Sequence, residues 1–229
     1  MKLLFFPICI LLSLSSLGQK QNISINYKPS FTYFGKQNQS FANSYFESRN
    51  GRNTFHNTVN ILYNCQLNSK FSLSSGLEYS EQGQSIDLKS SWIGGRTFAV
   101  ELNYLRIPLT LSYDFLSSRK NKLSLYSGLS VGFVIKRKDN YQNVIIEAIL
   151  LPPAEKRYKD YDWGIPFGVT FQKNISKTIF ANLGAEYLLG LTNSFSENSA
   201  SKFGVLSEFA NSKQSRAALN IGIGIRLTK

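Results

Sequence analysis

The chain has 229 residues and a formal net charge of +12, with 26 basic side chains, 14 acidic ones and a single histidine. One histidine and two cysteines do not supply the ligands of a transition-metal centre. A surplus of positive charge indicates either nucleic acid or anionic lipid head groups as a partner.

The first 18 residues have the pattern of a signal peptide. Lys2 provides a positive start, Leu3–Leu14 form an apolar run, and Ser16 and Gly18 are small residues at the positions that signal peptidase reads. The run is shorter than the ~20 residues that a membrane-spanning helix needs. We therefore predict export, with residues 1–18 removed and residues 19–229 forming the mature domain. An exported protein rarely meets nucleic acid, so we expect none, and we assign the positive charge to contacts with lipid.

The mature sequence alternates with a period of two along most of its length. Bulky apolar residues occupy odd positions, and small or polar residues occupy even ones. Because side chains alternate between the two faces of a strand, each such segment predicts a strand with one apolar face. The expected strands are residues 22–33, 55–67, 71–80, 105–113, 123–135, 161–171, 179–190 and 217–227.

The connections between these segments alternate in length. Short turns are expected at 68–69, 117–121 and 173–174, and four long loops at 35–54, 82–97, 136–159 and 192–215. Short periplasmic turns, long extracellular loops and two periplasmic termini are typical of bacterial outer-membrane barrels. We predict an all-β fold, an eight-stranded antiparallel up-and-down transmembrane β-barrel in the bacterial outer membrane, with the odd face toward lipid. The alternative is a soluble, lipocalin-like barrel with the odd face inward, which gives no reason for all long loops to share one end.

The even face is then the barrel interior. Strand glycines fall on even positions, as expected where an interior of about eight strands is filled by side chains. Buried charges require partners, so we expect an internal network in which Arg106 and Arg226 pair with Glu78 and Glu186. Such filling disfavours an open pore. Proline lacks a donor for the strand ladder, so a bulge or a local widening is expected at Pro108 and Pro166.

The segment Tyr104-Leu105-Arg106-Ile107-Pro108-Leu109, followed by Ser112-Tyr113, resembles the tyrosine-leucine-x-isoleucine-proline-leucine strand of PorT-like outer-membrane barrels. The preceding Gly76-Leu77-Glu78-Tyr79 fits the same pattern. The layout of nearly the whole mature chain is similar, although the specific motif is one strand. The resemblance implies outer-membrane integration and, for some members, a role in protein secretion.

Two patterns suggest catalysis. Gly128-Leu129-Ser130-Val131-Gly132 matches a nucleophile elbow, but that motif needs a sharp strand-to-helix turn and here lies within a strand. His56, the only histidine, could support acyl transfer in a lipid A-modifying or other lipid-acting enzyme, which is the alternative function. Its even position favours a polar contact at the rim of the interior. We predict no enzyme activity and no cofactor.

The expected outer loops carry the main functional hypothesis. Lys136, Arg137 and Lys138 form the densest basic cluster and are candidate contacts for lipopolysaccharide. Two of the expected loops also contain apolar residues, in the stretches 144–151 and 203–209. Exposed apolar patches mark interaction sites. The alternative is that these apolar residues pack on each other. The sequence therefore predicts a non-enzymatic structural or accessory subunit of an envelope complex, for protein secretion or surface assembly, whose loops bind a partner protein or lipopolysaccharide. The candidate partner-binding residues are Val144, Ile145, Ile146, Ile149, Leu150, Leu151, Phe203 and Phe209.

Overall fold

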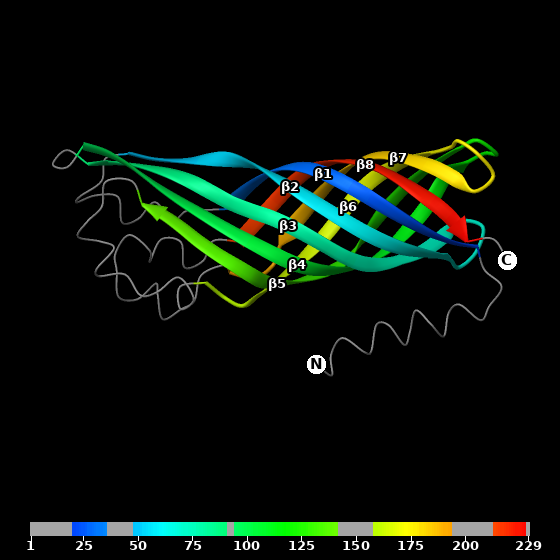
Figure 1. Ribbon diagram of the computed structural model, residues 1–229, viewed down its shortest axis with the longest axis horizontal. Coiled ribbons are helices and arrows are strands. Elements are labelled where there is room, and N and C mark those ends of the chain that lie inside the picture. The colour runs from blue at the N-terminus through cyan, green and yellow to red at the C-terminus, as the bar shows by residue number, and fades with distance from the viewer. Residues whose placement is uncertain (1–19, 36–47, 91–93, 142–157, 194–212, 228–229) are drawn as a thin grey trace.

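The computed structural model describes residues 20–35, 48–90, 94–141, 158–193 and 213–227. These residues form a closed barrel in which each strand is antiparallel to its neighbours and the first strand pairs with the last (Figure 1). The predicted eight-stranded up-and-down order is confirmed. The strands are β1 (Gln21–Gly35), β2 (Ser48–Gln66), β3 (Phe71–Ser90), β4 (Gly94–Ser117), β5 (Asn121–Tyr141), β6 (Tyr161–Asn174), β7 (Ile179–Gly190) and β8 (Lys213–Leu227).

The two faces of the barrel have the polarity expected of a protein whose outer surface meets hydrocarbon. Within the described residues, every exposed large apolar side chain except Leu116 has an odd number. Leu129 and Ile223 are 50 % and 55 % exposed, whereas Arg106 and Thr58 on the even face are fully buried. Leu109, Leu129 and Ile223 point outward, so the alternative with the apolar face inward is wrong. No helix in the described part of the chain is long and apolar enough to cross a membrane.

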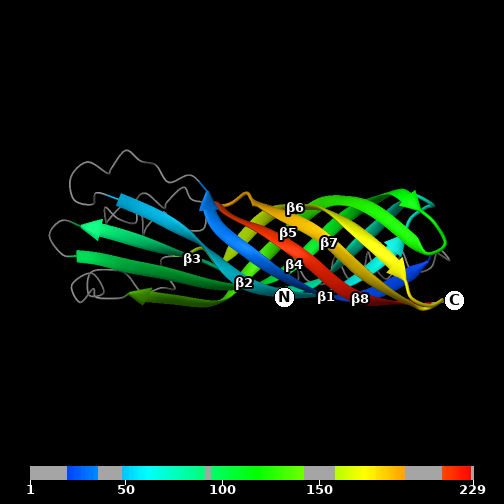
Figure 2. The same cartoon turned by 90° about the horizontal axis from the view of Figure 1, so that it is seen from above.

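The two ends of the barrel differ in length. Figures 1 and 2 show β2, β3, β4 and β5 continuing well past the point where β1, β6, β7 and β8 stop. At the opposite end the described strands are joined by the short connections 67–70, 118–120 and 175–178. The start of β1 and the end of β8 lie at this same end, where Gln21 pairs with both Cys65 and Leu227. We call it the short-turn end.

The prediction of a loop at residues 82–97 is wrong for nearly all of these residues. β3 runs to Ser90 and β4 starts at Gly94, and the ladder between them is continuous from Glu78↔Arg106 to Ser90↔Gly94. β2 and β5 likewise extend into predicted loops, to Ser48 and Tyr141. The polar composition of these stretches suggested loops. Because both strands of the hairpin extend together, each satisfies the backbone hydrogen bonds of the other.

The prolines locally open the ladder without changing its register. Between β3 and β4 the pairing passes from Ser75↔Leu109 to Glu78↔Arg106 and omits the two positions that include Pro108. Between β5 and β6 it passes from Ser127↔Phe167 to Ser130↔Gly164 and omits those that include Pro166. The ladder is therefore interrupted on one side of each proline, and the expected bulge is not present there.

Glycine at position 76 is required by the close approach of two strands. A Cβ built there would collide with the carbonyl oxygen of Ile61 and lie 3.0 Å from Leu62 Cα, all backbone atoms of β2. We expect Gly76→Ala to lower the free energy of unfolding by about 1–3 kcal/mol, as overpacking does. Urea unfolding in phospholipid vesicles, followed by tryptophan fluorescence, measures it.

The matched control is Gly164→Ala. Its Cβ would meet Leu188 Cδ1 at 2.9 Å, the end of a side chain, and would come no closer to the backbone than 3.1 Å, at the Leu189 carbonyl oxygen. A loss as large for Gly164→Ala as for Gly76→Ala would contradict the assignment of the cost to strand approach.

Candidate functional site

The centre of the barrel is closed by a ring of four charged side chains from four strands. Lys28 on β1 lies with its Nζ 2.9 Å from Glu78 Oε2 on β3 and 2.7 Å from Glu186 Oε2 on β7. Arg216 on β8 places Nη2 2.9 Å from Glu78 Oε1 and 2.6 Å from Glu186 Oε1. Each carboxylate contacts both cations, so the four formal charges cancel. We call Lys28, Glu78, Glu186 and Arg216 the central ring.

Neutral side chains add further hydrogen bonds to the central ring. Arg216 Nη1 donates to Ser80 Oγ at 2.7 Å and Thr58 Oγ1 at 3.1 Å. The hydroxyl of Tyr126 donates to Glu186 Oε2 at 2.9 Å. The side chains of the ring are at most 5 % exposed. Because buried charges persist when they are paired and hydrogen-bonded, this ring is a stable closure of the interior.

A second charged pair lies nearer the end opposite the short turns. Arg106 on β4 pairs with Asp162 on β6, and the guanidinium stacks 4.6 Å from the centre of the Tyr104 ring. Thr192 donates to the free oxygen of Asp162 at 2.6 Å. The Tyr104 hydroxyl donates to Gln214 Oε1 at 3.1 Å. Two successive polar layers therefore cross the interior.

The ion pairs predicted from the sequence for Glu78 and Glu186 had the wrong cations. Glu78 and Glu186 do lie in the interior, but their partners are Lys28 and Arg216, whereas Arg106 binds Asp162. Arg226 lies at the short-turn end, where it donates to Asn174 and to the Lys177 carbonyl. Arg216 was missed because residues up to 215 were read as loop. Its even number, which matches the interior parity of β8, was the available signal.

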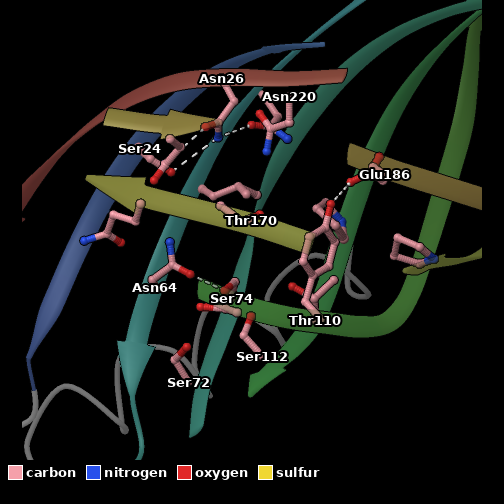
Figure 3. Close-up of a pocket in the computed structure, with 18 of the residues that line it drawn as sticks. Ser24, Asn26, Asn64, Ser72, Ser74, Thr110, Ser112, Thr170, Glu186 and Asn220 are labelled. Carbon is pink, nitrogen blue, oxygen red and sulfur yellow. Dashed lines mark hydrogen bonds between the residues drawn. The ribbon is translucent and has the colours of Figure 1, made fainter. Parts of the chain in front are cut away.

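Below the central ring, toward the short turns, the interior holds a polar cavity of about 120 Å³ (Figure 3). Its walls are mainly amide and hydroxyl side chains, with Asn26 donating to Asn60 at 2.8 Å and Ser74 bonded to Asn64. The buried Oδ1 of Asn220 has no hydrogen-bond partner among the described residues. The cavity therefore keeps hydrogen-bonding capacity for water or a small polar solute.

A β-bulge orients the basic cluster of β5. The β4–β5 register passes from Tyr104↔Val134 to Asn103↔Lys136, so Ile135 is an extra residue. Beyond it the parity reverses, and Lys136 and Lys138 are exposed although their numbers are even. Arg137 lies between them, only 15 % exposed, and pairs with Asp160. Two of the three predicted basic residues therefore point outward, and the third forms an ion pair with an exposed carboxylate.

The residues proposed for catalysis are not arranged for it. His56 Nε2 lies 2.7 Å from Thr54 Oγ1, and the hydrogen bonds of the described residues place no carboxylate on its ring. Gly128 and Gly132 lie within β5, opposite Thr110 and Arg106 of β4, without a strand-to-helix turn. No group of three His, Cys, Asp or Glu side chains able to hold a metal ion occurs in the described ranges.

The eight apolar loop residues predicted to bind a partner, Val144, Ile145, Ile146, Ile149, Leu150, Leu151, Phe203 and Phe209, lie outside the described residues.

Several solved outer-membrane barrels resemble this fold. OprG from Pseudomonas aeruginosa has a TM-score of 0.51 and 9 % identity, with 93 % of this chain and 98 % of that chain covered. Outer membrane protein W from E. coli has a TM-score of 0.47 and 12 % identity, covering 92 % and 100 %. Ail, the attachment invasion locus protein of Yersinia pestis, has a TM-score of 0.46 and 11 % identity, also covering 92 % and 100 %. At such identities the likeness concerns the fold alone. A comparison with curated proteins found no match.

The sequence itself matches a family model. The model of the outer membrane protein β-barrel domain aligns with residues 18–196, most of the chain. The match includes seven complete strands, β1 to β7, and most of the outward apolar surface described above. The chain therefore belongs to the outer membrane protein β-barrel domain family, and the outer membrane is where its barrel resides.

Proposed function

We propose that this protein is a non-enzymatic accessory subunit of an envelope complex, and that its outer extension binds a partner protein. The observation that carries the proposal is the length of β2, β3, β4 and β5, which have 19, 20, 24 and 21 residues. A membrane-spanning strand needs only about 9–11 residues. The surplus forms a four-stranded sheet beyond the barrel rim (Figure 2), which we call the outer extension.

The outer extension has two lateral edges suited to strand pairing. Among the described residues, β1 pairs with β2 only as far as Thr32↔Thr54, and β5 pairs with β6 only as far as Phe133↔Tyr161. Beyond these points the backbones of β2 and β5 each have a described partner on one side. Strand edges of this kind recruit an extended segment of another chain by backbone hydrogen bonding.

Lipopolysaccharide is the second expected contact of the same region. Lys136 and Lys138 point outward from β5, just above the exposed apolar side chains Phe133 and Ile135. Ammonium groups at the edge of an apolar band suit the phosphates of lipid head groups. This contact would orient the outer extension relative to the membrane surface.

The closed interior supports a binding role over transport. The central ring crosses the lumen, and the Arg106–Asp162 pair forms a further layer. The likeness of the Tyr104–Leu109 segment to PorT-like barrels favours a complex concerned with protein secretion or surface assembly. The short turns and both termini would then face the periplasm.

Site-specific photo-crosslinking in native outer membranes tests the proposal. With a photo-reactive amino acid replacing Lys138, we expect one protein partner to be captured in stoichiometric yield. The matched control places the same residue at Leu125, which is equally exposed (53 %, against 57 % for the Lys138 side chain) but lies near the short-turn end.

The same capture at Leu125, or adducts with lipopolysaccharide alone at position 138, would overturn the partner-binding role.

A further inference from the structure

The described residues at the short-turn end of the barrel have more cationic than acidic side chains. Its described segments, residues 20–22, 66–72, 114–122, 172–180 and 226–227, contain a single carboxylate, Asp114. Asp114 is buried and pairs with Lys122 at 2.7 Å. Six exposed cations remain, which we call the turn collar: Lys20, Lys70, Arg119, Lys120, Lys173 and Lys177.

Hydrogen bonds between turns hold part of the turn collar in place. The Asn174 amide donates to the Lys120 carbonyl at 2.7 Å, and its side chain donates to the Arg119 carbonyl at 2.8 Å. Arg226 Nη1 donates to the Lys177 carbonyl at 3.1 Å. The β4–β5 and β6–β7 turns are therefore tied together. Their four cations lie on one framework, without an ion pair to any described carboxylate.

Apolar side chains lie among these cations. Ile175, in the β6–β7 turn, is 64 % exposed, and Leu116 is 54 % exposed. Leu116 is the one even-numbered residue of the outward apolar set, because the β4–β5 register shifts between Asp114 and Leu116. Side chains of this size do not favour water, which suits a position of the turn collar at the membrane interface.

A shallow groove on the outward face begins next to the turn collar. Its floor is formed at Ser127 and Ala185, small residues that lie among the larger side chains of Leu111, Leu125 and Val169. Two aromatic pairs border it, Phe71–Tyr113 and Phe167–Tyr187, each with ring centres 5.2 Å apart. Phe71 directly follows Lys70, so the groove extends from the cationic end into the apolar surface.

We propose that the turn collar and this groove bind an anionic glycerophospholipid of the leaflet at the short-turn end. Arg119, Lys120, Lys173 and Lys177 would hold the head group through its negatively charged phosphate, and one acyl chain would lie in the groove. Positive charge with neighbouring apolar surface fits a lipid better than a soluble acidic protein, which would leave Ile175 and the groove uncovered. The site is at the opposite end from the outer extension and does not depend on its function.

Native mass spectrometry of the purified, folded full-length protein tests this, with phosphatidylglycerol and phosphatidylethanolamine of identical acyl chains as probes. We expect phosphatidylglycerol to be retained preferentially. The double variant Lys173→Gln/Lys177→Gln should weaken its retention by roughly 30-fold, about fivefold for each charge removed near a membrane surface. The matched control, Lys159→Gln/Lys213→Gln, removes two cations at the other end and should leave retention unchanged.

A groove variant separates the two halves of the site. Ala185→Leu fills the floor, and we expect it to lower retention of both lipids while the preference for phosphatidylglycerol persists. Equal retention of the two lipids by the unmodified protein would overturn the proposal. So would a control variant as defective as the Lys173→Gln/Lys177→Gln variant. Complete displacement of phosphatidylglycerol by inorganic phosphate would show a site for free phosphate and would overturn it too.

Discussion

Replacing Arg216 by methionine is expected to lower the free energy of unfolding by about 3–5 kcal/mol, the usual cost of breaking a buried ion pair on one side. Arg216 is 1 % exposed and is bound by both carboxylates of the central ring. Without it, Lys28 alone faces Glu78 and Glu186, so one buried negative charge is uncompensated. Urea unfolding of the protein in phospholipid vesicles gives the value.

A second substitution identifies the origin of that cost. In the double variant Arg216→Met/Glu186→Gln, the ring keeps one cation and one anion. Adding Glu186→Gln to the Arg216→Met variant should therefore lower the free energy of unfolding by less than Glu186→Gln does in the unmodified protein. Non-additivity of this kind is expected for residues in one network. A strictly additive double variant would show that the four charges do not act as a unit.

Arg226→Met provides the control for position. Arg226 is only half-buried, and it donates to the neutral oxygens of Asn174 and Lys177. Its removal should cost about 1 kcal/mol, the net contribution of ordinary hydrogen bonds. Equal losses at 216 and 226 would contradict the assignment of the interior charge network to the central ring.

The arrangement of the barrel could be predicted from the sequence because period-two alternation indicates both where the strands lie and which side chains face outward. Leu109, Leu129 and Ile223 point outward as their odd numbers require, because the pleat leaves no other option within a continuous strand. The prediction fails where the pleat is interrupted. At Ile135 and between Asp114 and Leu116 the register shifts by one residue, and no residue type marks these bulges in the sequence.

The partners within the interior could not be predicted, because they depend on how the closed barrel aligns strands that are far apart in the chain. Glu78 and Arg106 are directly opposite on neighbouring strands, which makes them the natural pair from local reasoning. Arg106 instead reaches Asp162, and Glu78 binds Lys28 and Arg216. Lys28 and Glu186 are 158 positions apart. Their contact is set by the stagger of all eight strands, which no single segment encodes.

The second large effect is expected on the outward face, where Leu129→Arg should lower the free energy of unfolding by about 2–4 kcal/mol if position 129 lies near the bilayer midplane. Leu129 is 50 % exposed in the middle of β5, opposite Leu109. A guanidinium there must leave water for hydrocarbon, whereas leucine is favoured by the same transfer. Unfolding in vesicles by urea, with the tryptophan signal as the reporter, measures the difference.

Phe133→Arg is the matched variant at another depth. Phe133 is on the same strand and the same face, 42 % exposed, but lies next to the outward-pointing Lys136. The cost there should fall to about 0–1 kcal/mol, because an arginine near the interface reaches the head groups. If the odd face met water, neither substitution would lower the free energy of unfolding. If the odd face were packed against a protein core, both substitutions would lower it equally. A steep difference between positions 129 and 133 is therefore a result that only a hydrocarbon layer of limited thickness produces.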